Sequence, residues 1–186
     1  MPFTSTDIPG LLLFEPDVFG DSRGCFFESY NEKKFREAGI DLRWVQDNQS
    51  SSVYGVIRGL HYQLPPFAQS KLARVLTGKI LDVVVDIRKG SPTFGKTYSK
   101  VLSAKNKRQL YIPKGFAHGF SVLSAKAEVL YKCDEFYNKE TENGIIYNDA
   151  ELNIDWRIPE ENKIISEKDL QLPIFSQCHN SFVFEG

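Results

Sequence analysis

The chain has 186 residues, of which 41% are hydrophobic and 13% aromatic, so we expect a globular protein with a substantial core and not a disordered chain. Its 23 basic and 24 acidic residues leave a net charge of −1, which gives no electrostatic reason to expect nucleic acid as a partner. The three cysteines form no CxxC pair, which argues against a disulfide framework or a zinc knuckle and favours a reducing cytoplasm. The first residues, "MPFTSTDIPG", do not resemble a signal peptide, and no apolar run is long enough to span a membrane.

Short β-rich runs separated by glycine, proline and asparagine dominate the chain. In chain order they cover residues 11–16, 24–30, 71–90, 109–124 and 127–137. Within the third run, Thr77-Gly78 is typical of a hairpin turn, and the period of two places Leu81, Val83, Val85 and Ile87 on one face. Many short antiparallel strands without repeats or linkers predict a single domain over residues 1–186, built as a sandwich or barrel.

Helix signals are few, and we expect only short peripheral helices. Ser29 and Glu32 have the spacing of a capping box before "EKKFREAG", and Gly39 is well placed to end that helix. A second box opens at Ser166, three residues before Asp169. The simplest role for Asp169 is therefore the acid of that capping box.

Two segments, "RGLHYQ" around His61 and "PKGFAH" around His118, each place glycine ahead of a histidine, where the backbone can turn or approach a ligand closely. Their spacing resembles the two sequence motifs of the cupin superfamily, a small jelly-roll barrel. Metal-binding cupins carry His-x-His followed by an acidic ligand. This chain instead has Gln63 at the position of the second histidine, and no acidic residue lies between Gln63 and Lys79. His179 is expected to be exposed in the tail, and two histidines alone do not make a metal site. We therefore expect no metal, and we expect His61, if it has a role, to act as an acid or base.

Other candidates have simple structural interpretations when they are taken singly. Lys71 precedes a strand and is typical of a surface lysine, while Tyr131 shares a strand face with Val129 and Cys133 and is typical of a core aromatic residue. Arg23 lies in a turn, and Glu28 is an isolated carboxylate on a strand. Both would ordinarily be exposed to solvent.

The combination of segments is more informative than any one residue. In order, the chain contains "FGDSRGCFFESY", "VQDNQSSS", "VIRGLHYQ", "QSKLARVLTGKILDVVVDIRKGSPTFG", "LSAKNKRQLYIPKGFAHGFSVLS", "AEVLYKCDEFYNKETENGIIYND" and "ISEKD". Together these blocks closely resemble the dTDP-4-dehydrorhamnose 3,5-epimerase family, from about Gly10 to Pro173. The tail after Pro173 lies outside the resemblance.

The resemblance implies a cupin-fold homodimer that needs neither metal nor organic cofactor. Its expected reaction converts dTDP-4-dehydro-6-deoxy-α-D-glucose to dTDP-4-dehydro-β-L-rhamnose, by inversion at C3 and C5 through enolates, in dTDP-L-rhamnose biosynthesis. The implied catalytic residues are His61 as base, Asp169 as its partner, Lys71 as the donor to the enolate oxygen and Tyr131 as general acid. The implied substrate-binding residues are Arg23, Glu28, Gln46, Asp47, Asn48, Arg58, Lys71, His118, Tyr137, Glu142 and Lys168. Family members often lend the Arg23 and Glu28 segment across the dimer.

Three alternatives stay open at the level of sequence. A related mono-epimerase would invert only C3 or only C5 and would share residues like His61 and Tyr131. A non-catalytic sugar-nucleotide-binding cupin would need neither a base nor an acid, so the joint presence of His61, Lys71, Tyr131 and Asp169 argues against it. A metal-dependent cupin oxygenase is the third alternative.

Overall fold

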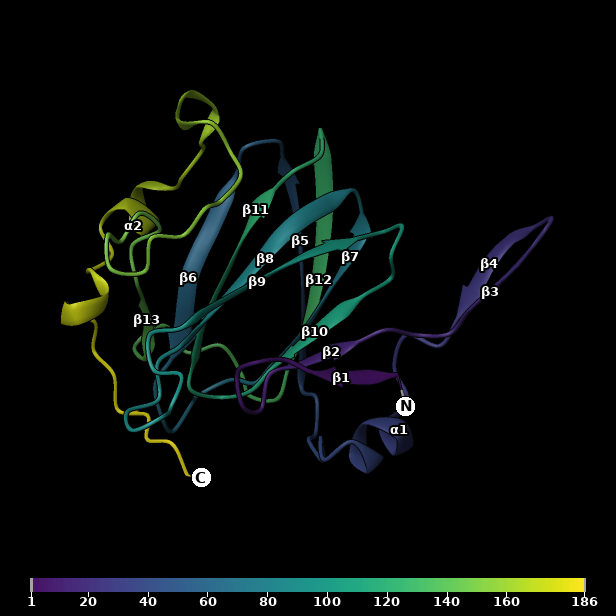
Figure 1. The fold of residues 1–186 in the computed structure, drawn as a ribbon, viewed down its shortest axis with the longest axis horizontal. Coiled ribbons are helices and arrows are strands. Elements are labelled where there is room, and N and C mark those ends of the chain that lie inside the picture. Colours follow the sequence, from purple (N-terminus) through teal and green to yellow (C-terminus); the bar gives the residue numbers. More distant parts are fainter. Residues whose placement is uncertain (1, 186) are drawn as a thin grey trace.

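The computed structural model describes residues 2–185, and nearly all of their regular structure is β (Figure 1). The strands are β1 (Phe3–Ser5), β2 (Leu12–Phe14), β3 (Val18–Asp21), β4 (Gly24–Phe27), β5 (Gln46–Val53), β6 (Ile57–Gln63), β7 (Lys71–Thr77), β8 (Lys79–Asp86), β9 (Thr97–Ser103), β10 (Gln109–Ile112), β11 (Phe116–Val122), β12 (Lys126–Cys133) and β13 (Glu142–Gly144). The helices are short: α1 (Glu32–Glu37), α2 (Glu167–Leu170) and the 3-10 turns η1 (Glu160–Asn162) and η2 (Phe175–Gln177). The prediction of a mainly β protein with a few short helices is confirmed.

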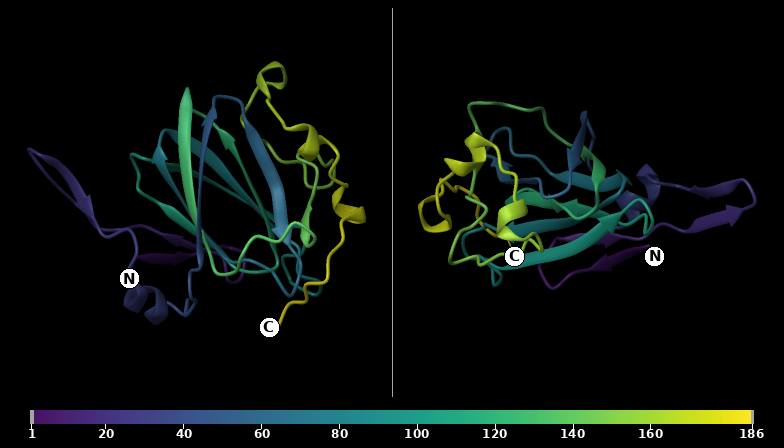
Figure 2. Two further views of the ribbon diagram at one scale, coloured as in Figure 1. Left: turned by 180° about the vertical axis from the view of Figure 1, so that it is seen from behind. Right: turned by 90° about the horizontal axis from the view of Figure 1, so that it is seen from above.

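Two antiparallel sheets enclose a common interior. A six-stranded sheet has the order β1-β2-β10-β7-β12-β5, and a five-stranded sheet has the order β13-β6-β11-β8-β9. The views in Figure 2 show the two sheets curling around one barrel, with the C-terminal segments on the outer side of the five-stranded sheet. This is the jelly-roll arrangement predicted from the sequence.

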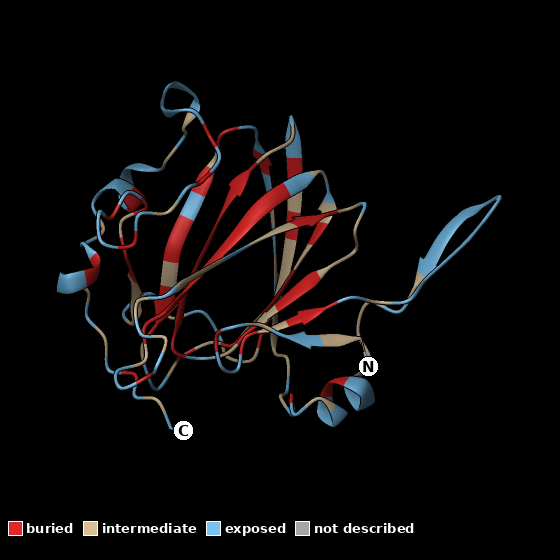
Figure 3. Ribbon diagram, viewed as in Figure 1, coloured by how far each residue is buried: buried red, intermediate tan, exposed pale blue. Residues whose placement is uncertain are grey.

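Every residue of strand β8 after Lys79 is buried, so both faces of this strand are covered (Figure 3). Leu81, Val83, Val85 and Ile87 pack outward in one cluster, as predicted, together with Trp156 and other C-terminal residues. The alternate residues of the strand face the interior of the barrel. An antiparallel strand can be apolar on both faces only if a second layer covers it, and the segments after β13 supply that layer.

The prediction of a hairpin at Thr77-Gly78 is wrong. β7 pairs with β10 and β12, whereas β8 pairs with β11 and β9, so the chain crosses from one sheet to the other at this turn. Gly78 has a φ of +80°, and a Cβ there would lie 2.1 Å from the carbonyl oxygen of Lys126. The turn needs glycine for this crossing, and the local sequence signal is the same as that of a hairpin.

The caps of the two helices agree with the sequence in part. The N-cap of α1 is Asn31, whose side chain accepts from Lys34 N, so the capping box expected at Ser29 is wrong by two residues. Gly39, with a φ of +85°, lies just past the end of this helix, as predicted. Ser166 caps α2 by accepting from Asp169 N at 3.1 Å, also as predicted.

Strands β3 and β4 form a two-stranded arm that projects from the barrel (Figure 1). Phe19 and Phe26 are register partners on this arm, and they are 66% and 72% exposed. An isolated ribbon of two strands is marginally stable in water, and an exposed apolar pair on such a ribbon is a candidate contact surface.

Candidate active site

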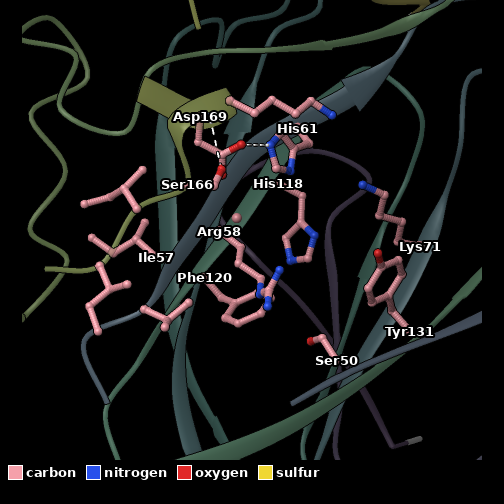
Figure 4. Close-up of a pocket in the computed structure, with 15 residues that line it drawn as sticks. Ser50, Ile57, Arg58, His61, Lys71, His118, Phe120, Tyr131, Ser166 and Asp169 are labelled. Atoms are coloured by element: carbon pink, nitrogen blue, oxygen red, sulfur yellow. Dashed lines mark hydrogen bonds and ion pairs between the residues drawn. The ribbon is translucent and has the colours of Figure 1, made fainter. Parts of the chain in front are cut away.

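A cavity of about 470 Å³ opens between the two sheets (Figure 4). The five-stranded sheet and the segment through α2 line one side, and β5, β7 and β12 line the other. The lining residues are Ser50, Val56, Ile57, Arg58, His61, Lys71, His118, Gly119, Phe120, Tyr131, Ile164, Ile165, Ser166, Lys168 and Asp169. The structure therefore brings together the four catalytic candidates, of which Lys71 is also a binding candidate, and three further binding candidates, Arg58, His118 and Lys168.

Two glycines allow the histidine-bearing strands to come close together. A Cβ on Gly59 would lie 2.6 Å from the Cα of Gly119, and a Cβ on Gly119 would lie 2.6 Å from the carbonyl oxygen of Arg58. The expected close approach of the backbone is therefore found between β6 and β11 themselves. As a result His61 and His118 are directly opposite in the register of these strands.

Asp169 holds His61 at the rim of the cavity (Figure 4). Its Oδ1 lies 2.9 Å from Nε2 of His61, and its Oδ2 accepts from Gly59 N at 3.2 Å. Burial favours a raised pKa for Asp169, but hydrogen bonds from His61, Gly59 N and Ser166 outweigh burial and hold this pKa below its usual value. The carboxylate of Asp169 therefore bonds to His61. The capping-box role that the sequence suggested for this side chain is not observed.

A second histidine–carboxylate pair lies beside the first. Nε2 of His118 is 2.8 Å from Oδ1 of Asp82, and Asp82 is a fully buried residue of β8. Sequence reasoning missed Asp82. The signal that could have revealed it is a single acid in the apolar run "KILDVVV", because an interior carboxylate needs a partner.

Lys71 and Tyr131 face the cavity from the six-stranded sheet. Nζ of Lys71 lies 5.9 Å from the centroid of the Tyr131 ring. Burial lowers the pKa of Lys71 and raises the pKa of Tyr131. Lys71 makes no ion pair with any residue that the structure describes. A half-buried lysine and a half-buried tyrosine thus lie opposite His61 across the cavity.

Several binding candidates lie at the cavity or next to it. Arg58 donates through Nε to Ser52 Oγ at 3.1 Å, which holds the guanidinium at the wall of the cavity. Near α2, Glu142 Oε2 accepts from Lys168 Nζ at 2.6 Å and from the Tyr137 hydroxyl at 2.7 Å.

The strand β5 contributes polar side chains to the interior. Gln46 and Asn48 point inward and are joined by a hydrogen bond of 3.0 Å, and Asn48 is the register partner of Tyr131. Ser50 lines the cavity as well and was missed by sequence reasoning, as was Ser52. The signal that could have found both serines is the run 46–52, in which every inward position is polar although the strand belongs to a closed barrel.

Three binding candidates are not at the cavity of this chain. Asp47 lies on the outer face of β5 and pairs with Lys132 at 3.0 Å, because neighbouring residues of a strand point to opposite faces. Arg23, near the turn of the arm, is paired with Asp21. Glu28 follows the arm and forms an ion pair with Lys34 of α1, whose backbone N–H donates to the N-cap residue Asn31.

The donor groups at the cavity do not fit a divalent metal of the iron or zinc kind. Residues 2–185 contain no group of three or more histidine, cysteine, aspartate or glutamate side chains that could hold an ion. At the position where a metal-binding cupin has a ligand, Gln63 instead donates its amide to the carbonyl oxygens of Phe67 and Phe136. His179 is exposed, as predicted, and lies in the tail.

Comparisons with known proteins point to one family. A family model described as dTDP-4-dehydrorhamnose 3,5-epimerase matches residues 5–177, slightly more than the range expected from sequence motifs. A relative from Shigella flexneri with that name is 56% identical over 171 residues, covering 91% of this chain and 93% of the relative. The crystal structure of the enzyme of that name from Elizabethkingia anophelis NUHP1 has a TM-score of 0.90 and 53% identity, covering 94% of this chain and 96% of the other. A Legionella pneumophila Philadelphia 1 epimerase in complex with dTDP-4-keto-L-rhamnose also has a TM-score of 0.90, with 49% identity and coverage of 94% and 93%.

Proposed function

The chain belongs to the dTDP-4-dehydrorhamnose 3,5-epimerase family, and we propose that the cavity between its two sheets is the site of that reaction. The enzyme is an isomerase that converts dTDP-4-dehydro-6-deoxy-α-D-glucose to dTDP-4-dehydro-β-L-rhamnose. C3 and C5 flank the C4 ketone, so removing a proton from either carbon gives an enolate. The observation that carries the proposal is that His61 and Tyr131 face one cavity from opposite sheets.

His61 is the base that removes each proton. Its Nε2 is held by Asp169, so Nδ1 is the nitrogen left to accept a proton from carbon. The ionised carboxylate of Asp169 stabilises the imidazolium that forms and orients the ring. General-base help of this kind contributes roughly 10²- to 10⁴-fold to the rate.

Lys71 stabilises the enolate oxygen. Its ammonium group lies in the cavity with no protein carboxylate bonded to it, so it is available to an oxygen that becomes negative during the reaction. A donor that is already in place needs no rearrangement at the moment of reaction. Such a donor contributes about 3–4 kcal/mol to stabilising the transition state.

Tyr131 returns a proton to the opposite face of the carbon. Inversion requires that the proton leave one face and arrive at the other, and His61 and Tyr131 lie on opposing walls. Burial raises the pKa of Tyr131, which keeps the phenol protonated at neutral pH and ready to donate.

Polar groups beside the catalytic residues suit a nucleoside diphosphate sugar. Arg58 and Lys168 bring positive charge to the cavity, and a guanidinium group can meet two phosphate oxygens at once. His118, Gln46 and Asn48 offer hydrogen bonds to the sugar and phosphates. Tyr137 and Glu142 lie next to Lys168, where an exposed aromatic ring suits a nucleobase.

The decisive experiment is incubation of the enzyme with dTDP-4-dehydro-6-deoxy-α-D-glucose in deuterated water. We expect deuterium at both C3 and C5 and inversion of both carbons, read by NMR. Exchange and inversion at one carbon alone would identify a mono-epimerase. Tight binding without any exchange would identify a non-catalytic sugar-nucleotide-binding cupin.

The enzyme acts as a homodimer in which the arm of each chain reaches the other. Phe19 and Phe26 form an exposed apolar pair on a ribbon that projects from its own barrel, and a second copy would cover them. The same arrangement would carry Arg23 and Glu28 to the cavity of the partner, which accounts for their distance from the cavity of their own chain (Figure 1).

Mixing two inactive variants tests this sharing. Arg23→Ala and His61→Asn each damage the site, but a hybrid dimer has one site with His61 intact and Arg23 supplied by the other chain. Random mixing should restore about a quarter of the parent activity, because half of the dimers are hybrids with one complete site. No restoration, with hybrid dimers shown by native mass spectrometry, would mean that each site is built from one chain.

We also assign the enzyme to the cytoplasm, because Cys25, Cys133 and Cys178 are all unpaired thiols. The structure contains no helix in residues 2–185 of the length and apolarity that a membrane crossing needs. Cell fractionation checks the assignment, and recovery of the enzyme outside the cytoplasmic fraction would contradict it.

A further inference from the structure

The two ends of the arm are held by one short segment at the start of β10. This segment is residues 107–109, and each of its residues makes a different contact with the ends of the arm. Nζ of Lys107 lies 5.3 Å from the ring centroid of Phe27, the last residue of the arm. Nε of Arg108 donates to Oε1 of Glu15 at 2.5 Å, shortly before the arm begins. The outgoing and the incoming ends of the arm are therefore tied to neighbouring residues.

The third contact of this segment lies on the far side of Glu28. The side-chain amide of Gln109, a residue that is 1% exposed, donates to the carbonyl oxygen of Ser29 at 2.7 Å. Gln109 is the register partner of Arg74, whose Cζ lies 5.5 Å from the ring centroid of Phe27. Cations within about 6 Å of an aromatic ring are attracted to its face. Phe27 and Ser29 are thus both fixed, and Glu28 is the residue between them.

The loop that presents these residues is itself held in one conformation. Oδ1 of Asn106 accepts from the backbone N–H groups of Ser103 and Arg108, at 3.0 and 3.1 Å. Asn106 N in turn donates to Ser103 Oγ at 3.0 Å. Lys107 has a φ of +56°, which is uncommon for a residue other than glycine and persists only where the surrounding structure holds it. The segment is therefore a fixed platform for the ends of the arm.

We propose that residues 107–109, the arm socket, are positioning residues for the active site of the partner subunit. They set the direction in which the arm leaves the barrel, and so they decide where Arg23 and Glu28 lie in that site. The inference rests on the proposed sharing of the arm between two chains. A two-stranded ribbon has little stability of its own, so its direction has to be fixed at its ends. The arm socket acts without touching the substrate, since it is not among the described residues that line the cavity.

The consequence of a displaced arm is a loss of binding and not of chemistry. Arg23 and Glu28 belong to the groups expected to bind the nucleotide and the sugar, whereas His61 and Tyr131 lie on strands of the barrel. Contacts made by the arm are the same in the substrate complex and in the transition state. KM should therefore rise while kcat stays near the parent value. A general structural defect would lower kcat as well.

The test measures the affinity for dTDP by calorimetry, which requires no chemical step. The socket variant combines Lys107→Asn, Arg108→Gln and Gln109→Met, and asparagine suits the positive φ at the first of these positions. Removing a cation–π contact, an ion pair and a hydrogen bond should weaken dTDP binding by about tenfold. Lys105→Asn is the matched control, because it removes an exposed lysine of the same loop, and it should leave the affinity unchanged. Native mass spectrometry establishes that each sample is dimeric.

A double-mutant cycle assigns the effect to the arm. The variant Arg23→Ala/Glu28→Ala should itself weaken dTDP binding, and adding the socket changes should then cause no further loss. Two losses that simply multiply would overturn the proposal, because the arm socket would then act by another route. Parent affinity in a folded, dimeric socket variant would overturn it too. If the socket variant does not fold, Lys107→Asn/Arg108→Gln takes its place on the same terms, since both side chains are partly exposed.

These outcomes are separate from those that test the proposed function. A protein that follows the cycle but exchanges no deuterium would keep the arm socket and lose the epimerase reaction. An enzyme that exchanges deuterium at C3 and C5, while Arg23→Ala/Glu28→Ala binds dTDP as tightly as the parent, would keep the reaction and lose the arm socket.

Discussion

Asp169 lies 108 residues after His61 in the chain, yet its Oδ1 is 2.9 Å from Nε2 of that histidine. The carboxylate is held independently of any ligand, because Ser166 caps its helix and Gly59 N donates to its other oxygen. The ring of His61 is therefore oriented before substrate arrives, with Nε2 engaged and Nδ1 free to act.

The first prediction follows from that orientation. His61→Asn should abolish epimerisation and deuterium exchange at both carbons, because the amide that replaces the imidazole cannot accept a proton from carbon. Asp169→Asn should lower the rate by roughly 10²- to 10⁴-fold but leave some exchange, because an imidazole remains in a poorer orientation or tautomer. Exchange is measured by NMR in deuterated water, and binding of dTDP by calorimetry should persist in both variants. Exchange at the parent rate in His61→Asn would assign the base to another residue.

The second prediction concerns metals. Because His61 and His118 are each bonded to a carboxylate and Gln63 stands where a ligand is needed, we expect chelators to leave turnover unchanged. The measurement is turnover after exhaustive dialysis against a chelator, with metal content determined on the same sample. Loss of turnover that one added metal restores would require a different mechanism.

The third prediction concerns stability and Asp86, a buried carboxylate outside the active site. Its oxygens accept from Arg88 Nη2 at 2.7 Å, from Ser91 Oγ at 2.6 Å and from Thr93 Oγ1 at 2.7 Å. Burial favours a raised pKa for Asp86, but these hydrogen bonds outweigh burial and hold the pKa below 3.8. A lowered folded-state pKa stabilises the protein above the unfolded value of 3.8, and this contribution is lost as the pH falls through the folded value.

Asp86→Asn should therefore cost roughly 3 kcal/mol of unfolding free energy near neutral pH, because Arg88 loses its buried counter-charge. The difference from the parent should shrink in acid. Urea unfolding at several pH values checks both points. We also propose that residues 1–186 form one domain, so each curve should show a single transition. A cost that is the same at all pH values would show that the charge of Asp86 does not stabilise the fold.

Local patterns predicted those parts of the fold that depend on neighbouring residues. The alternation in β8 identified an apolar face correctly, and Gly39 and Ser166 identified helix ends. The turn at Thr77-Gly78 was misread, because glycine is needed equally for a hairpin and for a crossing between sheets. Which strands pair is decided by contacts between residues far apart in the chain, and the sequence of a two-residue turn contains no information about those contacts.

The same limit applies to the active site. Spacing drew attention to His61 and His118, but nothing local joins His61 to Asp169 or His118 to Asp82. The resemblance to a family supplied the first of these pairs and not the second. Asp47, a binding candidate by resemblance, lies on the outer face of β5, because a neighbour of two inward-facing residues on a strand points outward.

The last prediction separates the acid from the base. Tyr131→Phe keeps the shape of the side chain and removes only the hydroxyl, so the fold should survive and the enolate should still form. Nζ of Lys71 lies 5.9 Å from the centroid of this ring, so loss of the hydroxyl leaves the donor to the enolate oxygen in place. The missing part is a proton source on the face opposite His61.

Without that source, the easiest fate of the enolate is to recapture a proton from His61, which restores the original configuration. In deuterated water Tyr131→Phe should therefore incorporate deuterium into the substrate with little inversion, provided that the imidazolium exchanges its proton before it is returned. NMR of the recovered sugar measures both quantities in one sample. The paired control is His61→Asn, which should show neither exchange nor inversion. Inversion by Tyr131→Phe at the parent rate would remove this tyrosine from the mechanism, and another donor would then have to reach the far face of the sugar.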